Sequence, residues 1–490
     1  MYDMTKDLAK IDQVIAAGYF KDNWGSLAEY QVPQWYKEAK FGIFIHWGVY
    51  SVPAFGSEWY PRMMYIEGSP EYEHHRKTYG EPKEFGYKEF IPMFRAERFD
   101  PAEWAELFAD AGAQYVVPVA EHHDGFQMYK SRISHWNAYE MGPKRDVLGE
   151  LKDEFGKRGL RTGASSHRIE HWFFLGHGKE FDSDIREPLQ RGDLYWPSMP
   201  EGDFQDLYSE PAPTEEFLQD WLVRTCELID EYQPRILYFD WWIQHSAAKP
   251  YLKKVAAYYY NRCKEWGETG VINYKHDAFR FGCAVPDVER GQFAEMKPYL
   301  WQTDTAVALN SWCYTENNTY RTCEELICDL VDIVSKNGRL LLNIGPKADG
   351  TIPKEDAAIL RGIGDWLKVN GEAIYGTNIW RSYGEGPTKI VEGQFADGIK
   401  KNFTSEDIRF TQGRDYLYAT VLKCSENGTY CIHSLGEQDA SKAANFHGII
   451  RKVEVLGTEE APIWSRDAEG LHIFTEKKSS APIVFRILVD

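Results

Sequence analysis

The sequence predicts a (β/α)8-type barrel followed by a small antiparallel β-sandwich domain. Over residues 30–375, stretches with helical spacing alternate with short apolar runs, which is typical of a parallel sheet. Polar residues repeatedly follow these runs, at the edge where barrel enzymes place their chemistry. After Thr377 the pattern changes to short alternating segments. We therefore expect a helical lead-in and a barrel over residues 1–377, and the β-sandwich over residues 378–490.

Each predicted barrel strand is a short apolar run that ends at a polar residue or a turn. The first, at residues 41–45, runs directly into His46, Trp47 and Gly48. Seven such strands can be placed, one fewer than a full barrel needs, so a doubly wound sheet stays an alternative. In chain order, we expect strands at residues 41–45, 115–119, 161–165, 236–239, 271–274, about 299–303, and 340–344.

Helices are predicted between these strands from apolar residues at helical spacing. Residues 103–112 and 215–232 each carry one apolar face. Pro234 ends the second of these helices, because proline cannot continue a helix. A third helix is expected at residues 323–335, where the following Asn337-Gly338 pair favours a left-handed cap.

The C-terminal region shows the alternation of half-buried strands, separated by Gly, Asn, Ser and Asp. This pattern indicates a small antiparallel β domain, which we expect to pack on the barrel. Its strands are predicted at residues 417–422, 430–433, 452–456, 471–474 and 483–489.

The composition of the chain argues against some classes of binding partner. A formal net charge of −19 argues against nucleic acid and against an anionic membrane surface, since both attract basic patches. With 17 Trp, 30 Tyr and 26 Phe, the 490-residue chain suits a small neutral ligand such as a sugar, although a large core uses aromatic residues equally well.

Targeting and cysteine patterns predict a location. The first 20 residues contain no long apolar run, so we expect neither a signal peptide nor a membrane span, and a cytoplasmic location. The eight cysteines form no CxxC pair, which indicates reduced thiols. We also expect a homo-oligomer, from the general frequency of such assemblies.

Two carboxylates are candidates for chemistry. Asp240, in the run ILYFDWW, stands at the C-terminal end of a predicted strand, where it either caps the backbone or acts in a site. If Asp240 acts as a nucleophile or base, the acid must come from a second carboxylate on a separate element. We choose Glu289, in a loop, although Asp287, Glu295 and Asp304 stay open on sequence alone.

Imidazole, carboxylate and indole groups also gather after the strands. His46 follows the first strand, with Glu58 and Trp59 soon after, and His122 and His123 follow the second. Such groups hydrogen-bond hydroxyls and stack on the apolar face of a sugar ring. These residues could also have a purely structural role. Adjacent histidines, for example, are often buried in a core or lie at the start of a helix.

Four motifs resemble the α-L-fucosidases of glycoside hydrolase family 29. They are the segment from Tyr36 to Tyr60 with HWG and SEWY, then HHDGF, GPKRDVLGEL and LLLNIGPKADGTIP. The resemblance implies a retaining exo-glycosidase that removes terminal α-L-fucosyl residues from fucosylated oligosaccharides or glycoconjugates without a metal or cofactor. It assigns Asp240 as nucleophile and Glu289 as acid and base. It assigns His46, Glu58, Trp59, His122 and His123 to the fucose hydroxyls, and Phe44, Tyr238 and Trp312 to the walls and the C6 methyl.

The chain departs from the family pattern at several positions. Asp287-Val288-Glu289 replaces the common Thr-Pro-Glu, Ser166 stands where a pocket tyrosine is common, and Lys275 replaces an arginine. In GASSHRIEHWFF, residues 167–171 offer charged and imidazole groups that would reshape the leaving-group side. These differences leave the linkage preference open.

Two other functions remain as alternatives. His46, His122, His123 and Asp240 at strand ends would also suit a metal-dependent barrel hydrolase. Against it, no H-E-x-x-H motif is present, and adjacent residues of a strand point to opposite faces. The other alternative is a fucose-binding protein without catalysis.

Overall fold

The computed structural model describes residues 2–437 and 446–490, and within them parallel strands at eight positions close into a barrel. Strand β1 (Phe41–Ile45) pairs with β2 (Tyr115–Glu121) on one side and β9 (Gly338–Ile344) on the other, which closes the ring. Strands β3 and β4 form one barrel position, interrupted at Gly163. The ring is completed by β3 (Arg161–Thr162), β4 (Ala164–Ser166), β5 (Ile236–Phe239), β6 (Val271–Tyr274), β7 (Val285–Glu289) and β8 (Trp301–Ala306).

The barrel strands are buried on both faces. Every residue of β1, β2, β5 and β9 is buried, because side chains fill the interior and helices cover the outside. The helices of the described residues are α1 (Thr5–Ala17), α2 (Trp24–Leu27), α3 (Gln34–Ala39), α4 (Tyr60–Met63), α5 (Pro70–Thr78), α6 (Pro101–Asp110), α7 (Val147–Lys157), α8 (His171–Phe174), α9 (Glu215–Tyr232), α10 (Lys249–Glu265), α11 (Cys323–Ser335) and α12 (Lys354–Asn370).

Local capping sets the helix ends. Helix α6 begins earlier than predicted because Oδ1 of Asp100 accepts a hydrogen bond from the backbone N–H of Ala102 at 2.9 Å. Helices α9 and α11 have the predicted bounds, and α11 starts with a capping box between Thr322 and Glu325. Asn337 adopts the predicted left-handed conformation, with φ of 74°.

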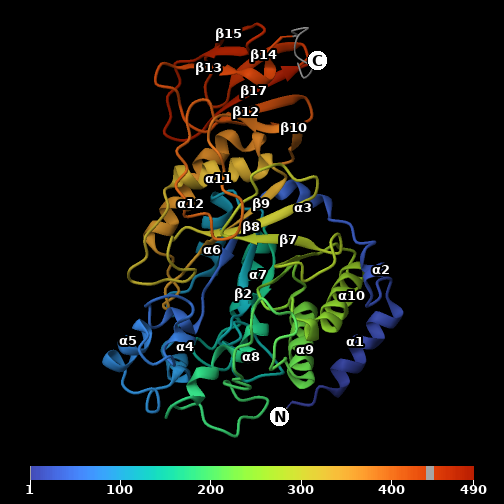
Figure 1. Ribbon diagram of the computed structural model, residues 1–490, viewed down its shortest axis with the longest axis vertical. Helices are drawn as coiled ribbons and strands as arrows, with labels where there is room; N and C mark the ends of the chain where they lie inside the picture. The colour runs from blue at the N-terminus through green and yellow to red at the C-terminus, as the bar shows by residue number, and fades with distance from the viewer. Residues whose placement is uncertain (1, 438–445) are drawn as a thin grey trace.

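The C-terminal region forms two antiparallel sheets that share one hydrophobic core. In Figure 1 these sheets lie beyond α11 and α12, at the end of the molecule farthest from the N-terminus. The five-stranded sheet has the order β10 (Asn378–Glu385), β11 (Ile408–Gln412), β12 (Tyr416–Val421), β17 (Ile483–Val489) and β14 (Ile450–Val455), and the three-stranded sheet has β13 (Thr429–Ile432), β16 (Leu471–Phe474) and β15 (Ile463–Arg466).

The β-sandwich packs on the barrel's helices. Tyr418 and Val484 belong to the same hydrophobic cluster as Leu326 of α11. Trp366 of α12 donates from Nε1 to the carbonyl of Pro482 at 2.9 Å. The predicted barrel and sandwich are therefore confirmed. The division of the chain after residue 377 stays a prediction, although β10 begins at Asn378.

One barrel strand was missing from the prediction. Strand β7, Val285–Glu289, is the eighth position of the ring, so the expectation that Glu289 lies in a loop is wrong. The sequence VPDVE has no apolar run because its carboxylates find buried partners in the folded chain. Among the described residues, no helix is both long and apolar enough to cross a membrane.

Candidate active site

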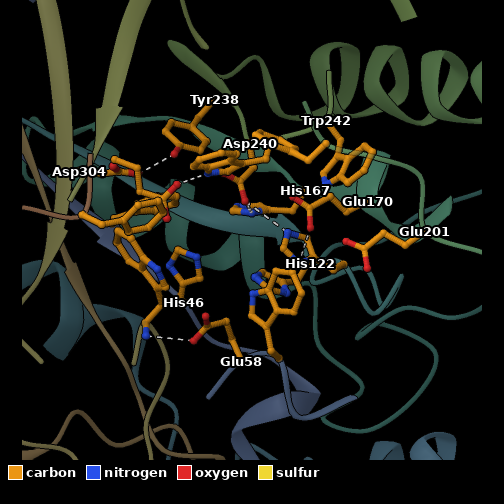
Figure 2. A pocket seen from close by; sticks show the side chains of 18 residues that line it. His46, Glu58, His122, His167, Glu170, Glu201, Tyr238, Asp240, Trp242 and Asp304 are labelled. Atoms are coloured by element: carbon orange, nitrogen blue, oxygen red, sulfur yellow. Dashed lines mark hydrogen bonds and ion pairs between the residues drawn. The ribbon is translucent and has the colours of Figure 1, made fainter. Parts of the chain in front are cut away.

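A cavity of about 480 Å³ opens at the carboxyl ends of the barrel strands. All ten site residues predicted from the sequence line it. Figure 2 labels five of them, and their side chains point toward one space: His46, Glu58, His122, Tyr238 and Asp240. The complete lining is Phe44, His46, Glu58, Trp59, His122, His123, His167, Glu170, Glu201, Phe204, Tyr238, Asp240, Trp241, Trp242, Glu289, Asp304, Trp312 and Phe395.

Asp240 follows the last residue of β5 and is held by two imidazoles. Nδ1 of His167 lies 2.9 Å from its Oδ2, and Nε2 of His123 lies 3.3 Å from the same oxygen. Burial alone would raise the pKa of Asp240, but the two histidines hold it well below its usual range. The side chain stays 13% exposed, toward the cavity. Asp240 is thus an oriented, ionised carboxylate that a ligand can reach.

Glu289 ends β7 and has the opposite protonation preference. Burial raises its pKa to about 8; Lys275 opposes this rise, and the charge of Asp240 adds to it. The indole Nε1 of Trp241 donates a hydrogen bond to its Oε2. Near neutral pH, therefore, the site pairs an ionised Asp240 with a protonated Glu289.

Lys275, just beyond β6, forms ion pairs with Glu289 and with two other buried carboxylates. Its ammonium group is fully buried and lies 2.5 Å from Asp287, 3.0 Å from Asp304 and 3.5 Å from Glu289. These carboxylates raise the pKa of Lys275 against the effect of its burial, so it stays charged. Asp287 is held by this ion pair and does not line the cavity, and Glu295 is exposed elsewhere.

Asp304 lines the cavity, but its oxygens are already engaged. Oδ2 accepts a hydrogen bond from the Tyr238 hydroxyl at 2.6 Å, and Lys275 contacts both oxygens. Of the four carboxylates that the sequence left open, Glu289 is therefore the one that combines a cavity position with a raised pKa and an indole donor.

The adjacent histidines both face the cavity, contrary to the alternation expected from a strand. Strand β2 ends at Glu121, so His122 and His123 lie beyond the extended backbone, and their rings stack with centroids 4.1 Å apart. Burial lowers the pKa of His123 to about 4, and that of His122 well below its usual value. Both rings are therefore neutral. Nδ1 of His122 is buried with no partner among the described residues.

The alternation argument against a metal site is consequently wrong. Ligand atoms of His46, His122 and His167 lie within 4.8 Å of one another, as do those of His123, His167 and Asp240. Neutral imidazoles are suitable ligands for a divalent ion. The geometry alone does not decide between sugar hydroxyls and an ion, so the chemistry needs a separate test.

His46 is oriented by the last barrel strand. Its Nδ1 donates to Oδ1 of Asn343 in β9 at 2.7 Å, which leaves Nε2 as an acceptor. The same asparagine donates from Nδ2 to the carbonyl of Trp312 at 2.6 Å. Burial lowers the pKa of His46 well below its usual value. One amide thus fixes both a polar group and an aromatic wall of the cavity.

Glu58 also reaches the Trp312 segment. Its Oε2 accepts a hydrogen bond from the backbone N–H of Trp312 at 3.0 Å and contacts the Ser311 hydroxyl at 3.3 Å. Burial raises the pKa of Glu58. Phe44 packs against Tyr238, with centroids 4.9 Å apart, so it serves the barrel core and the cavity wall together.

Eight lining residues were not assigned from the sequence. The sequence marks His167 and Glu170 only as departures from a family motif, although His167 is the nearest partner of Asp240. Burial raises the pKa of Glu170 well above its usual value, and its Oε2 lies 3.4 Å from Nδ1 of His123. Figure 2 shows Glu170, Glu201 and Trp242 on the side of the cavity opposite Asp304 and His46. The eight are His167, Glu170, Glu201, Phe204, Trp241, Trp242, Asp304 and Phe395.

Known proteins resemble this chain over most of its length. A protein-family model described as α-L-fucosidase matches residues 8–372. The plasma α-L-fucosidase of Homo sapiens is 35% identical over 392 residues, which cover 77% of this chain and 76% of that protein. The tissue α-L-fucosidase of Rattus norvegicus is 31% identical over 457 residues, which cover 92% and 87% of the two chains.

A solved structure shares the whole architecture. The α-fucosidase of Thermotoga maritima in complex with fucose superposes with a TM-score of 0.73 at 31% sequence identity. The match covers 96% of this chain and 100% of that chain. It therefore extends over the barrel and the C-terminal β-sandwich alike.

Proposed function

Since the chain belongs to the α-L-fucosidase family, we propose that it is a retaining α-L-fucosidase in which Asp240 is the nucleophile and Glu289 the acid and base. The resemblance seen in the four motifs is confirmed by the family match. The enzyme hydrolyses terminal α-L-fucosyl residues of oligosaccharides or glycoconjugates. The observation that carries the residue roles is the opposite protonation of the two cavity carboxylates, with one pKa held low and the other raised to about 8.

The first step uses both carboxylates at once. Asp240 attacks the anomeric carbon of the fucoside, and Glu289 gives its proton to the departing glycosidic oxygen. The products are a β-linked fucosyl-Asp240 ester and the free aglycone alcohol. In the second step Glu289, now ionised, takes a proton from water, whose oxygen attacks the same carbon and releases α-L-fucose and Asp240. Neither step needs a metal ion or an organic cofactor.

The other lining residues bind the fucose ring in this proposal. His46, His122, His123, Glu58 and Trp59 contact its hydroxyls, and the neutral imidazoles accept or donate without a desolvated charge. Phe44, Tyr238 and Trp312 form the apolar wall that takes the C6 methyl group. His123 has a second task, because Nε2 also holds Asp240.

The proposal is tested by hydrolysis of 4-nitrophenyl α-L-fucoside, followed by NMR of the first fucose released. We expect α-L-fucose before mutarotation, and no turnover of the matching β-D-galactoside or α-D-glucoside. Initial release of β-L-fucose would contradict a double displacement. Binding of fucose with no turnover would favour the non-catalytic alternative.

A cytoplasmic location and a homo-oligomeric state stay proposals. All eight cysteines are free, which is typical of a reducing compartment. Fractionation of the source cells and light scattering of the purified protein test the two points. Secretion into the medium, or a monomer at micromolar concentration, would contradict them.

A further inference from the structure

A segment of the C-terminal region reaches back to the barrel and lies beside the proposed acid and base. Residues 386–407, which we call the return segment, connect β10 to β11. The backbone N–H of Phe395 donates to the carbonyl of Glu289 at 3.0 Å, and that of Gly393 donates to the carbonyl of Gln292 at 3.1 Å. The return segment therefore runs antiparallel to the chain that leaves β7.

Side chains lock this contact. Asp397 pairs with the guanidinium of Arg290 at 3.1 Å and accepts a hydrogen bond from the hydroxyl of Thr305 at 2.5 Å. Both the acid and the base of the Arg290–Asp397 pair are largely buried. The backbone at Phe395 is thus held by its own hydrogen bond to Glu289 and by the contacts of Gly393 and Asp397 on either side of it.

The ring of Phe395 stands at the cavity and is 58% exposed. Its backbone has φ of +54°, in the left-handed region that non-glycine residues rarely adopt. Exposing a large apolar ring and holding it in this conformation both cost free energy, and such costs concentrate at functional sites. A ligand that covers the ring would recover part of the first cost.

Phe395 continues an aromatic wall. Its ring stacks on Trp241 with centroids 5.7 Å apart and planes 23° apart, and Trp241 packs against Phe204 at 4.7 Å. Trp241 also donates to the carboxyl group of Glu289. Glu201, whose side chain is 40% exposed, lines the same cavity and pairs with Arg62. Aromatic faces beside an exposed carboxylate suit a pyranose, which has both an apolar CH face and hydroxyl donors.

The place of this wall follows from the reaction. Glu289 must touch the glycosidic oxygen to protonate it, so the aglycone leaves on the side of Glu289. Both Trp241 and Phe395 contact Glu289 directly. We propose that Phe395, Trp241 and Phe204, with Glu201 at the rim, form a binding site for the pyranose that carries the fucose, and that the C-terminal return segment thereby sets aglycone specificity. This inference rests on the proposed fucosidase function.

The test compares two substrates that share the fucose and differ in the aglycone. For each enzyme, kcat/KM is measured on an α-L-fucosyl-galactose disaccharide and on methyl α-L-fucoside, and the ratio of the two values is taken. Because intrinsic leaving-group reactivity is the same for every variant, a change in this ratio between variants reports aglycone binding in the transition state.

We expect Phe395→Ala to lower the disaccharide-to-methyl ratio about five- to tenfold, the loss expected for one aromatic contact. Phe395→Tyr, which keeps the ring, should keep the ratio. Val391→Ala, an exposed apolar residue of the same segment that does not line the cavity, is the control for disturbance of the segment.

An unchanged ratio in Phe395→Ala, or an equal loss in Val391→Ala, would overturn the inference. Wild-type hydrolysis of the methyl fucoside with no hydrolysis of the disaccharide would also overturn it, while leaving the fucosidase function standing. Failure of the wild type on both fucosides would instead reject the proposed function.

Discussion

His167 holds Asp240 through Nδ1, which lies 2.9 Å from Oδ2, while the hydroxyl of Ser165 lies 3.0 Å from Nε2 of the same ring. With Nδ1–H donating to the carboxylate, Nε2 is free to accept from Ser165. This arrangement fixes the orientation of the ring and presents its proton to Asp240. The imidazole thereby favours the ionised form of the carboxylate that attacks the sugar.

Loss of His167 should therefore affect the nucleophile. In His167→Ala, we expect kcat/KM to fall about 10- to 100-fold, as for a misplaced reacting group. The pKa of Asp240 should rise, because a donor to its ionised form is lost, so the acid limb of the pH profile should move to higher pH.

His167→Asn is the matched control, since its amide can replace the Nδ1 donor. It should restore part of the activity and move the acid limb back. An acid limb at the same pH in all three enzymes would mean that His167 does not tune Asp240.

Glu289→Gln should slow hydrolysis most for substrates whose leaving group must be protonated. We expect kcat/KM to fall about 10²- to 10⁴-fold on a fucosyl disaccharide, and much less on 4-nitrophenyl α-L-fucoside, whose phenolate leaves unprotonated. In the wild type, activity on the disaccharide should fall above a pKa of about 8, because Glu289 must be protonated to act as the acid.

The exposed Glu295 supplies the comparison. Glu295→Gln should leave kcat/KM unchanged on both substrates, because that carboxylate does not line the cavity. Equal losses on both fucosides in Glu289→Gln would contradict the assignment of the acid.

Lys275→Met should lower stability and shift the alkaline limb. Removing the buried ammonium leaves Asp287 and Asp304 without their cation, which costs about 3–5 kcal/mol of unfolding free energy. It also removes the charge that opposes the rise of the Glu289 pKa, so the alkaline limb should move above its wild-type position. Urea unfolding and a pH profile of kcat/KM measure the two effects.

Lys336 offers a matched buried lysine away from the site. Its ammonium pairs with Asp332 at 2.6 Å under the C-terminal sheet, and its side chain is fully buried. Lys336→Met should also destabilise the protein, although less, because Asp332 keeps Arg409 as a second cation, and it should leave the alkaline limb in place. A shift of the alkaline limb in both variants would mean that the shift results from general destabilisation of the fold and not from the loss of the charge beside Glu289.

The barrel could be predicted where local pattern alone determines structure. Runs such as Phe41–Ile45 and Ile236–Phe239 are apolar because both faces of a barrel strand are buried, and their predicted bounds agree with the structure. Val285–Glu289 could not be found in this way. Its carboxylates are buried only because Lys275 and Trp241, which lie elsewhere in the chain, satisfy them.

The site shows the same division. Polar residues directly after predicted strands, such as His46 and Asp240, were identified from position. The sequence also indicates His122 and His123 as candidates, but their shared orientation toward the cavity depends on where β2 ends. Phe395 carries no local signal at all, because only the packing of the β-sandwich on the barrel brings the return segment to the cavity.

Metal chelation tests the remaining enzyme alternative. We expect full activity on 4-nitrophenyl α-L-fucoside after prolonged treatment with EDTA, because the two proposed steps use only Asp240 and Glu289. Added Zn²⁺ should inhibit, since ring nitrogens of His46, His122 and His167 lie within 4.8 Å of one another, close enough to bind one ion. Loss of activity in EDTA that Zn²⁺ restores would favour the metal-dependent hydrolase.

The most direct test of the account is the anomer formed when azide rescues Asp240→Gly. With the nucleophile removed, azide can enter the vacated space and attack the anomeric carbon from the face that Asp240 uses, so 4-nitrophenyl α-L-fucoside should give β-L-fucosyl azide. Glu289→Gly with azide should give α-L-fucosyl azide, because azide then replaces water in the second step. Formation of the α-azide by Asp240→Gly, or rescue of neither variant, would contradict the assignment of Asp240 as the nucleophile.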